Sequence, residues 1–142
     1  MSCARYTFII NQGETFYRRI VYKDSNGLPV DLTDYSGRLQ LRPSAGSSTI
    51  YLTLSSSIGS DGSGLNFTPA SQSISGTTVT TYTLPTTSGS IGITISAYSS
   101  SLLTFTEAVG DLFIYSGSGD TEYRDRVMEI KAKVSKSATS RT

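Results

Sequence analysis

The oxygen-bearing side chains that could bind a metal ion gather in one turn-rich stretch of the sequence. Asp24, Asn26 and Asp31 lie close together, and carboxylate and amide oxygens are the ligands that Ca²⁺ prefers. The match to a calcium loop ends after Asp24-x-Asn26, because no glutamate stands at its far end to bind in a bidentate way. Asn26-Gly27 is also a turn signal, since both residues tolerate positive φ. We therefore predict a turn held by Asx hydrogen bonds, and no metal site.

Groups for catalysis are sparse in the rest of the chain. There is no histidine and one cysteine, Cys3, which removes the commonest general base, the Ser-His and Cys-His pairs, and multi-thiolate metal sites. The glycine-rich run at residues 59–64 lacks the Lys-Ser/Thr of a phosphate-binding loop. Asp31 and Asp34 suit a local cap or turn better than an acid-base pair. Other carboxylates flank the last predicted hairpin and are expected to face solvent: Glu107, Asp111, Asp120, Glu122 and Asp125. We predict no enzymatic activity and no cofactor.

Basic and tyrosine side chains are the stronger functional candidates. Four arginines fall on two predicted strands that we expect to be neighbours: Arg18, Arg19, Arg38 and Arg42. Arg and Tyr together can bind nucleic acid, but a net charge of +1 gives no general attraction for a polyanion. Both residue types are also enriched at protein–protein interfaces. We therefore predict contacts between subunits, without nucleic acid, through these candidates: Arg18, Arg38, Arg42, Tyr51, Tyr82, Tyr123, Lys131 and Lys133.

Short β-strands are expected to position these side chains. Apolar and polar residues alternate along several segments, and a period of two is the main sign of a half-buried strand. Ile91, Ile93 and Ile95, for example, share one face of a predicted strand. The pattern predicts strands at residues 5–10, 14–24, 38–43, 48–55, 90–96, 110–116 and 123–135.

The alternation also predicts which side chains are buried. In residues 48–55, Ile50, Leu52 and Leu54 are expected to point inward and Tyr51 outward. The last strand should bury every second side chain from Met128 to Val134 and expose the lysines between them. Residues 110–116 are different, because both faces of that predicted strand are apolar.

Residues 55–88 interrupt this regular pattern. They are rich in Gly, Ser and Thr, and a connection of this length is usually functional or disordered. Two weak strands fit inside it, at residues 64–68 and 77–84. We interpret the segment as an elaborated loop or extra hairpin, and as a candidate functional surface. A short helical turn is expected in residues 97–105, a hairpin turn at 117–120 and a flexible tail at 136–142.

Many short strands with hardly any helix indicate an all-β fold, an antiparallel sandwich of one domain over residues 1–142. A partly closed barrel is the alternative. Neither an apolar run long enough to cross a membrane nor a secretory signal is visible. We therefore expect synthesis in a cytoplasm and no membrane partner.

Several segments together resemble one group of proteins. The matching runs are QGETF at residues 12–16, VYKDSNGLPVDLTDY at 21–35, GRLQLRPS at 37–44, GSIGITISA at 89–97 and VMEIKAKVS at 127–135. They resemble small virion structural proteins of tailed bacteriophages, including cyanophages, and the immunoglobulin-like N-terminal domain of phage baseplate upper proteins. The resemblance covers most of the chain except residues 59–88, and it departs at the charged run at 120–126.

The resemblance implies an immunoglobulin-like sandwich in a non-enzymatic virion protein. Such a protein is made in the host cytoplasm, works by assembly, and has other virion proteins and copies of itself as partners. The tail, baseplate or fibre-attachment region is the expected location, and a capsid decoration or cement protein is an alternative. A third possibility is a carbohydrate-binding module for host attachment, in which Tyr51 and Tyr82 would stack on sugar rings.

Overall fold

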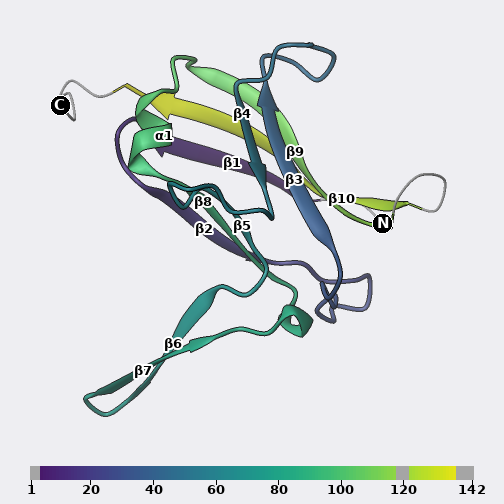
Figure 1. Ribbon diagram of the computed structural model, residues 1–142, viewed down its shortest axis with the longest axis vertical. Helices are drawn as coiled ribbons and strands as arrows, with labels where there is room; N and C mark the ends of the chain where they lie inside the picture. Colours follow the sequence, from purple (N-terminus) through teal and green to yellow (C-terminus); the bar gives the residue numbers. More distant parts are fainter. Residues whose placement is uncertain (1–3, 118–121, 137–142) are drawn as a thin grey trace.

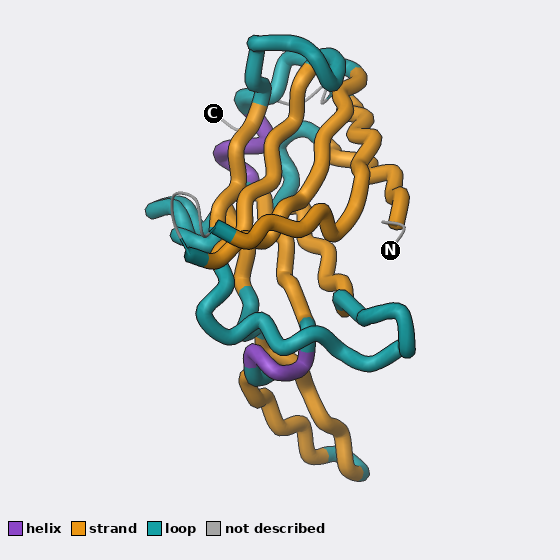
Figure 2. Tube along the Cα trace, turned by 90° about the vertical axis from the view of Figure 1, so that its right-hand side faces the viewer, coloured by secondary structure: helices purple, strands orange, loops and turns teal. Residues whose placement is uncertain are grey.

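Two β-sheets packed face to face form the body of the protein, and a third, two-stranded sheet projects from one end (Figures 1 and 2). This computed structural model describes residues 4–117 and 122–136. The larger sheet has five strands in the order β1-β10-β9-β3-β4. Their bounds are β1 Ala4–Asn11, β3 Ser36–Arg42, β4 Leu52–Ser55, β9 Glu107–Ser116 and β10 Tyr123–Ser135.

The smaller sheet of the body completes an immunoglobulin-like arrangement. It has the order β2-β8-β5, with β2 at Phe16–Val21, β5 at Gly64–Asn66 and β8 at Ser90–Ile95. Numbered along the chain, the second, fifth and eighth strands form one layer, and the first, third, fourth, ninth and tenth form the other. Except that β1 joins the larger sheet, this distribution is that of a variable-type immunoglobulin sandwich. The sandwich prediction is confirmed, with one parallel pair, β1 with β10, among antiparallel neighbours.

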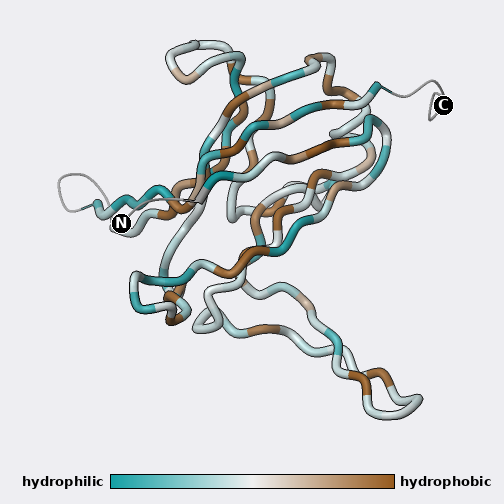
Figure 3. The backbone as a smooth tube through the Cα atoms, turned by 180° about the vertical axis from the view of Figure 1, so that it is seen from behind, coloured by the Kyte–Doolittle hydropathy of each residue, from teal (hydrophilic) through white to brown (hydrophobic). Residues whose placement is uncertain are grey.

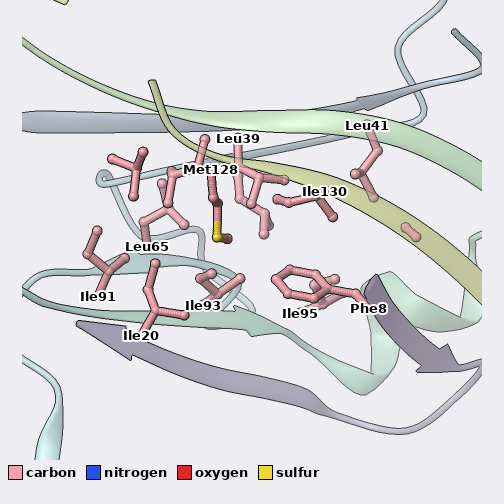
Figure 4. Packing of buried hydrophobic residues seen from close by; sticks show 14 of the residues in the cluster. Phe8, Ile20, Leu39, Leu41, Leu65, Ile91, Ile93, Ile95, Met128 and Ile130 are labelled. Carbon is pink, nitrogen blue, oxygen red and sulfur yellow. The ribbon is translucent and has the colours of Figure 1, made fainter. Parts of the chain in front are cut away.

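The core lies between the two sheets and consists of alternate side chains (Figure 4). Ile91, Ile93 and Ile95 of β8 are at most 2% exposed, as their spacing predicts. On the opposite sheet, Met128, Ile130, Ala132 and Val134 of β10 are buried, and the lysines between them are exposed. Burial of a side chain of Ile size contributes about 1.5–3 kcal/mol, so this layer accounts for much of the stability.

The connection from β2 to β3 crosses between the sheets and does not form a hairpin. β2 pairs with β8, whereas β3 pairs with β4 and β9. Our expectation that these two strands are neighbours is therefore wrong. Asn26-Gly27 does make a tight turn, in which Gly27 has φ 80°, but the chain then runs on to the other layer. Leu32, on this connection, is 1% exposed and anchors it to the core.

The predicted strand at residues 48–55 is shorter than its alternation suggests. β4 begins only at Leu52, and Leu54 is buried as expected. Ile50, predicted to point inward, is 44% exposed. It precedes the first ladder pair of β4, which joins Leu52 to Leu41. The sheet therefore does not fix the direction of its side chain.

A short helix, α1 (Ala97–Ser101), closes one end of the sandwich after β8. The side chain of Ser96 accepts a hydrogen bond from Ser99 N at 3.0 Å and so caps the N-terminus of the helix. At the other end of β8 lies η1 (Thr86–Ser88). Of the predicted turn at 117–120 only Gly117 is described, and of the tail at 136–142 only Lys136. The rest of both falls outside the described residues.

The two-stranded sheet is a hairpin that we call the arm, residues 69–84. It contains β6 (Ala70–Ser75) and β7 (Thr78–Thr83), and Figure 1 shows it extending away from the body. The extra hairpin is therefore narrower than residues 55–88. The strand predicted at residues 64–68 corresponds to β5 and belongs to the body. Leu65 in β5 is 1% exposed, and Phe67 just after it is 9% exposed. The strand predicted at residues 77–84 is β7, and β6 had no sequence prediction.

The arm is expected to be dispensable for folding. Residues 70–83 can be replaced by Asn-Gly, because Leu84 N already donates to Pro69 O at 2.9 Å and a two-residue turn can join that pair. We expect the free energy of unfolding to change by less than about 1 kcal/mol, since the side chains removed are mostly exposed. Urea denaturation measures this. By contrast, Leu65→Ala should cost about 2–5 kcal/mol, and a similar loss on removing the arm would contradict the assignment.

Candidate functional site

The aspartates of the turn-rich stretch act as local turn formers. Asp24 Oδ1 accepts hydrogen bonds from Asn26 N at 2.9 Å and Leu28 N at 3.0 Å. Asp31 Oδ1 accepts from the hydroxyl and the backbone N of Thr33, at 2.6 and 2.9 Å, and these bonds lower the pKa of Asp31. The predicted Asx turns are confirmed. In the part of the chain that the structure describes, no three His, Cys, Asp or Glu residues gather as a metal site.

A second carboxylate, Asp61, fastens the loop before β5 to the start of α1. Asp61 Oδ2 accepts from the hydroxyls of Ser96 and Ser99, at 2.6 and 2.5 Å. Together with the bonds from Ser63, these hold the pKa of Asp61 well below its usual range. The sequence pattern did not indicate this contact, because Asp61 lies 35 residues before Ser96 in the chain. The bonds from Ser63 are local, and those from Ser96 and Ser99 join two separate segments of the chain, so we assign Asp61 a structural role.

The outer face of the five-stranded sheet carries the largest organised set of polar side chains. The ladders align them in rows across the strands. Arg38 of β3 and Arg126 of β10 flank Phe113 of β9 on either side. In the adjacent row, Asp111 of β9 stands opposite Glu129 of β10. Because strand neighbours in a row lie about 5 Å apart, charges and rings are held in fixed contact across this face.

These rows line a hollow of about 870 Å³ on the surface of the sheet. Phe113 and Tyr115 form part of its floor and are half-buried. Arg126 lies 5.5 Å from the centre of the Phe113 ring, and Arg124 lies 5.7 Å from the centre of the Tyr115 ring. Both distances suit cation–π attraction, worth about 0.5–1 kcal/mol at an exposed site. The rings thus hold the guanidinium groups over the hollow.

Cations outnumber carboxylates in the hollow. The carboxylates that line it are Asp111 and Glu129, and the cations are Arg5, Arg38, Arg42, Arg124, Arg126 and Lys131. Arg5 pairs with Glu129 at 2.9 Å, and Arg126 contacts both carboxylates, at 3.6 and 3.1 Å. Within residues 4–117 and 122–136, Arg38 and Lys131 form no ion pair. We call this outer surface, with its six cations and two rings, the charged face.

Several predicted interface residues meet on the charged face. Arg38, Arg42 and Lys131 line the hollow. Arg42 is held by Ser47 O at 2.6 Å and Gln40 Oε1 at 2.9 Å. Lys133 lies farther along β10, opposite Glu107 of β9. Residues from distant parts of the sequence thus come together because β3, β9 and β10 are adjacent.

Arg18 stands apart from this group, against our expectation that it lies beside Arg38 and Arg42. It belongs to β2, in the other sheet. Its guanidinium lies 5.5 Å from the centre of the Phe8 ring, and Phe8 also contacts Phe16 with ring centres 5.0 Å apart. Arg18 therefore covers the edge of the core between β1 and β2.

The three predicted tyrosines lie at separate places. Tyr51 stacks on Phe105, with ring centres 4.5 Å apart and an angle of 11° between the planes. Tyr123 contacts Tyr35 edge to face at 6.2 Å. Tyr82 is on the arm and 45% exposed. Phe105 follows α1 at one end of β8, whereas the arm joins the other end (Figure 1). Tyr51 and Tyr82 therefore do not form one sugar-stacking surface.

Sequence reasoning missed the two rings of the hollow. Phe113 and Tyr115 alternate with Leu112 and Ile114, which are buried on the inner side. The available signal was the apolar character of both faces of residues 110–116. An inner layer explains only one of those faces, so the second indicated an outer contact surface. Arg124 and Arg126 fall in the flank of the last predicted hairpin and were not among the predicted interface residues.

An immunoglobulin-like sandwich with one charged, hollowed sheet face is the class of protein that these features define. No family model matches the chain, and no curated protein matches it. Among solved structures, the N-terminal domain of phage TP901-1 ORF48 is similar over 90% of this chain and 83% of that chain, at 10% identity and a TM-score of 0.46. A likeness of this size assigns no function by itself. Across the described residues, no helix has the length and apolar character needed to span a membrane.

Proposed function

We propose that this chain is a non-enzymatic structural protein of a bacteriophage virion, which assembles by binding an acidic protein surface at the charged face. The observation that carries the proposal is the row of Arg38, Phe113 and Arg126 across three strands. Arginine and aromatic side chains are the residues that most often dominate binding energy at protein interfaces. Here they rest on a rigid sheet, so little side-chain order has to be gained on binding.

The charge of the hollow favours a partner that presents carboxylates. Its six cations face two carboxylates, and Arg38 carries no ion pair within the described part of the chain. An Asp or Glu of a partner can accept two hydrogen bonds from one guanidinium, which adds direction as well as attraction. The existing pairs of Arg5 and Arg126 are exposed, and such pairs contribute only about 0–1 kcal/mol. They can therefore be exchanged for partner contacts at low cost.

A place in the tail or baseplate is the finer part of the proposal. It is supported by the resemblance of the runs at residues 12–44 and 89–97 to baseplate-related domains. A decoration protein of the capsid would use the same sandwich, so location needs its own measurement. Mass spectrometry of separated heads and tails provides it. Recovery with tails is expected, and recovery only with heads would replace this placement by the capsid alternative.

Charge reversal on the charged face is expected to reduce incorporation into particles. In the double variant Arg38→Glu with Lys131→Glu, the expected loss is at least tenfold, because two cations that can meet partner carboxylates become repulsive. The number of copies per purified particle, counted by mass spectrometry, measures the effect. Arg19→Glu with Lys23→Glu is the matched control, since it makes the same two charge reversals at exposed residues that do not line the hollow. Equal incorporation of both variants would contradict the proposed use of this face.

A further inference from the structure

The arm carries no charge, and neither do the segments next to it in the chain. Residues 62–106 contain no Asp, Glu, Lys or Arg, and Figure 3 shows the arm as mostly pale with apolar patches. All six residues of β7 are exposed. Ile74, Val79 and Tyr82 are 69%, 55% and 45% exposed. Because these side chains are exposed, packing against the body adds little to the stability of the hairpin. Pairing with a partner strand would bury them and stabilise it.

Both long edges of the arm are open. Among the described residues, β6 and β7 pair only with each other, through six consecutive residue pairs from Ala70 with Thr83 to Ser75 with Thr78. In an antiparallel hairpin every second residue turns its N–H and C=O outward. A two-residue turn follows Ser75, and Leu84 N donates inward to Pro69 O. The outward groups of β7 therefore belong to Val79, Thr81 and Thr83.

Soluble proteins normally protect such edges. Charged side chains, proline, bulges or a covering segment prevent edge-to-edge pairing. The paired residues of the arm include no charge and no proline, and their register runs without a shift. A single two-stranded hairpin is marginal in water, whereas a sheet of three or more strands is stable. The arm thus has an unprotected edge to which further strands can be added.

We infer that β7 pairs with β7 of a second copy of this chain, antiparallel and centred on Thr81, to form a four-stranded sheet. The two outward groups of Thr81 then bond to those of Thr81 in the second copy, and Val79 pairs with Thr83. On the opposite side of the sheet, each Tyr82 stands across from a Thr80. Aromatic with β-branched pairs of this kind stabilise sheets by about 0.2–1 kcal/mol each.

A second copy fits this edge better than an unrelated chain, and β7 fits better than β6. Two neutral strands meet without like-charge repulsion, and an antiparallel pair of identical strands is two-fold symmetric, as in most homodimers. β7 consists of Thr, Val and Tyr residues, all of which favour strands. β6 is half serine, which favours turns. The contact is separate from the charged face, so it does not depend on the virion role proposed above.

Proline substitutions on the two edges test the inference. Light scattering of the full chain across a concentration series should give the mass of two chains at high concentration. Thr81→Pro removes an outward donor without breaking an inner ladder bond, and it should leave the protein monomeric. Gln72→Pro makes the same change on the β6 edge and should leave the dimer intact. A wild-type monomer at all concentrations, or dissociation only by Gln72→Pro, would overturn the inference.

Disulfide trapping tests the geometry independently. In a Cys3→Ser background, Thr81→Cys places two thiols opposite each other across the two-fold axis, at a spacing that a disulfide can span. Non-reducing electrophoresis should show a covalent dimer. Gln72→Cys, on the outer edge of both arms, should stay monomeric. Cross-linking at Gln72 instead, or open-ended ladders of larger species, would show that the arm pairs by its other edge or with the body, and the two-fold β7 contact would be rejected.

Discussion

Replacing Gly110 with alanine is expected to destabilise the protein by about 3 kcal/mol or more. Gly110 lies in β9, opposite Leu41 of β3 and Ile130 of β10. A Cβ atom at this position would overlap Gln40 O and would lie 2.8 Å from Leu41 Cδ2. The first contact is with backbone, which cannot rotate away, so β3 and β9 would have to separate. Typical domains are stable by only about 5–15 kcal/mol in total.

Urea denaturation of the purified variant measures this loss, and soluble yield gives a second reading. Gly46→Ala is the matched control, because beyond its two chain neighbours no other residue has an atom within 4 Å of the position of its Cβ. That variant should be at least as stable as the wild type. A Gly110→Ala protein with an unchanged midpoint would show that the two strands can move apart without cost. The charged face would then be less rigid than its rows suggest.

The sequence predicted the faces of the strands better than their partners. A period of two follows directly from the geometry of an extended chain, so Ile93 and Met128 were placed correctly in the core. Pairing depends on contacts between residues far apart in the chain. The turn at Asn26-Gly27 suits both a hairpin and a crossing between sheets, and alternation cannot distinguish the two. For this reason Arg18 was grouped with Arg38, although it lies in the other layer.

The same limit applies to the functional residues. Arg38, Arg42 and Lys131 were chosen by residue type, and the structure brings them to one hollow. Phe113 and Arg126 were missed, because their importance arises only from adjacent positions on β9 and β10. A strand with two apolar faces in a two-layer protein indicates an outer contact surface. This rule would have identified Phe113 from sequence.

The two candidate surfaces suit different kinds of partner. The charged face is rigid, because its arginines rest on rings and its rows are fixed by ladders. Under the function proposed above, it recognises a complementary pattern of charge. The arm is neutral and, under the β7 pairing that we infer, recognises an unpaired strand edge, with affinity from main-chain hydrogen bonds. A protein with both surfaces can contact an acidic neighbour through one and a copy of itself through the other. Two separate contacts on each subunit allow subunits to be linked into a larger assembly.

Both surfaces depend on the core that joins the two sheets, and Ile93→Ala is expected to weaken it by about 2–5 kcal/mol. Ile93 is fully buried at the centre of β8, where it pairs with Arg18 and Leu65 (Figure 4). Its side chain points toward the layer that contains Met128 and Leu39, so truncation leaves a cavity between the sheets. The midpoint of urea denaturation should fall while its slope stays the same.

Ile9→Ala provides the same chemical change without a cavity, because Ile9 is 60% exposed on β1. Its effect should be within about 0.5 kcal/mol. A difference of less than about 1 kcal/mol between the two variants would mean that the sheets close around the missing side chain. Otherwise the cost of Ile93→Ala measures how firmly β8 is held against the five-stranded sheet. The arm joins the body at β5 and β8. Weaker packing of β8 would therefore also loosen the attachment of the arm to the sheet that carries the charged face.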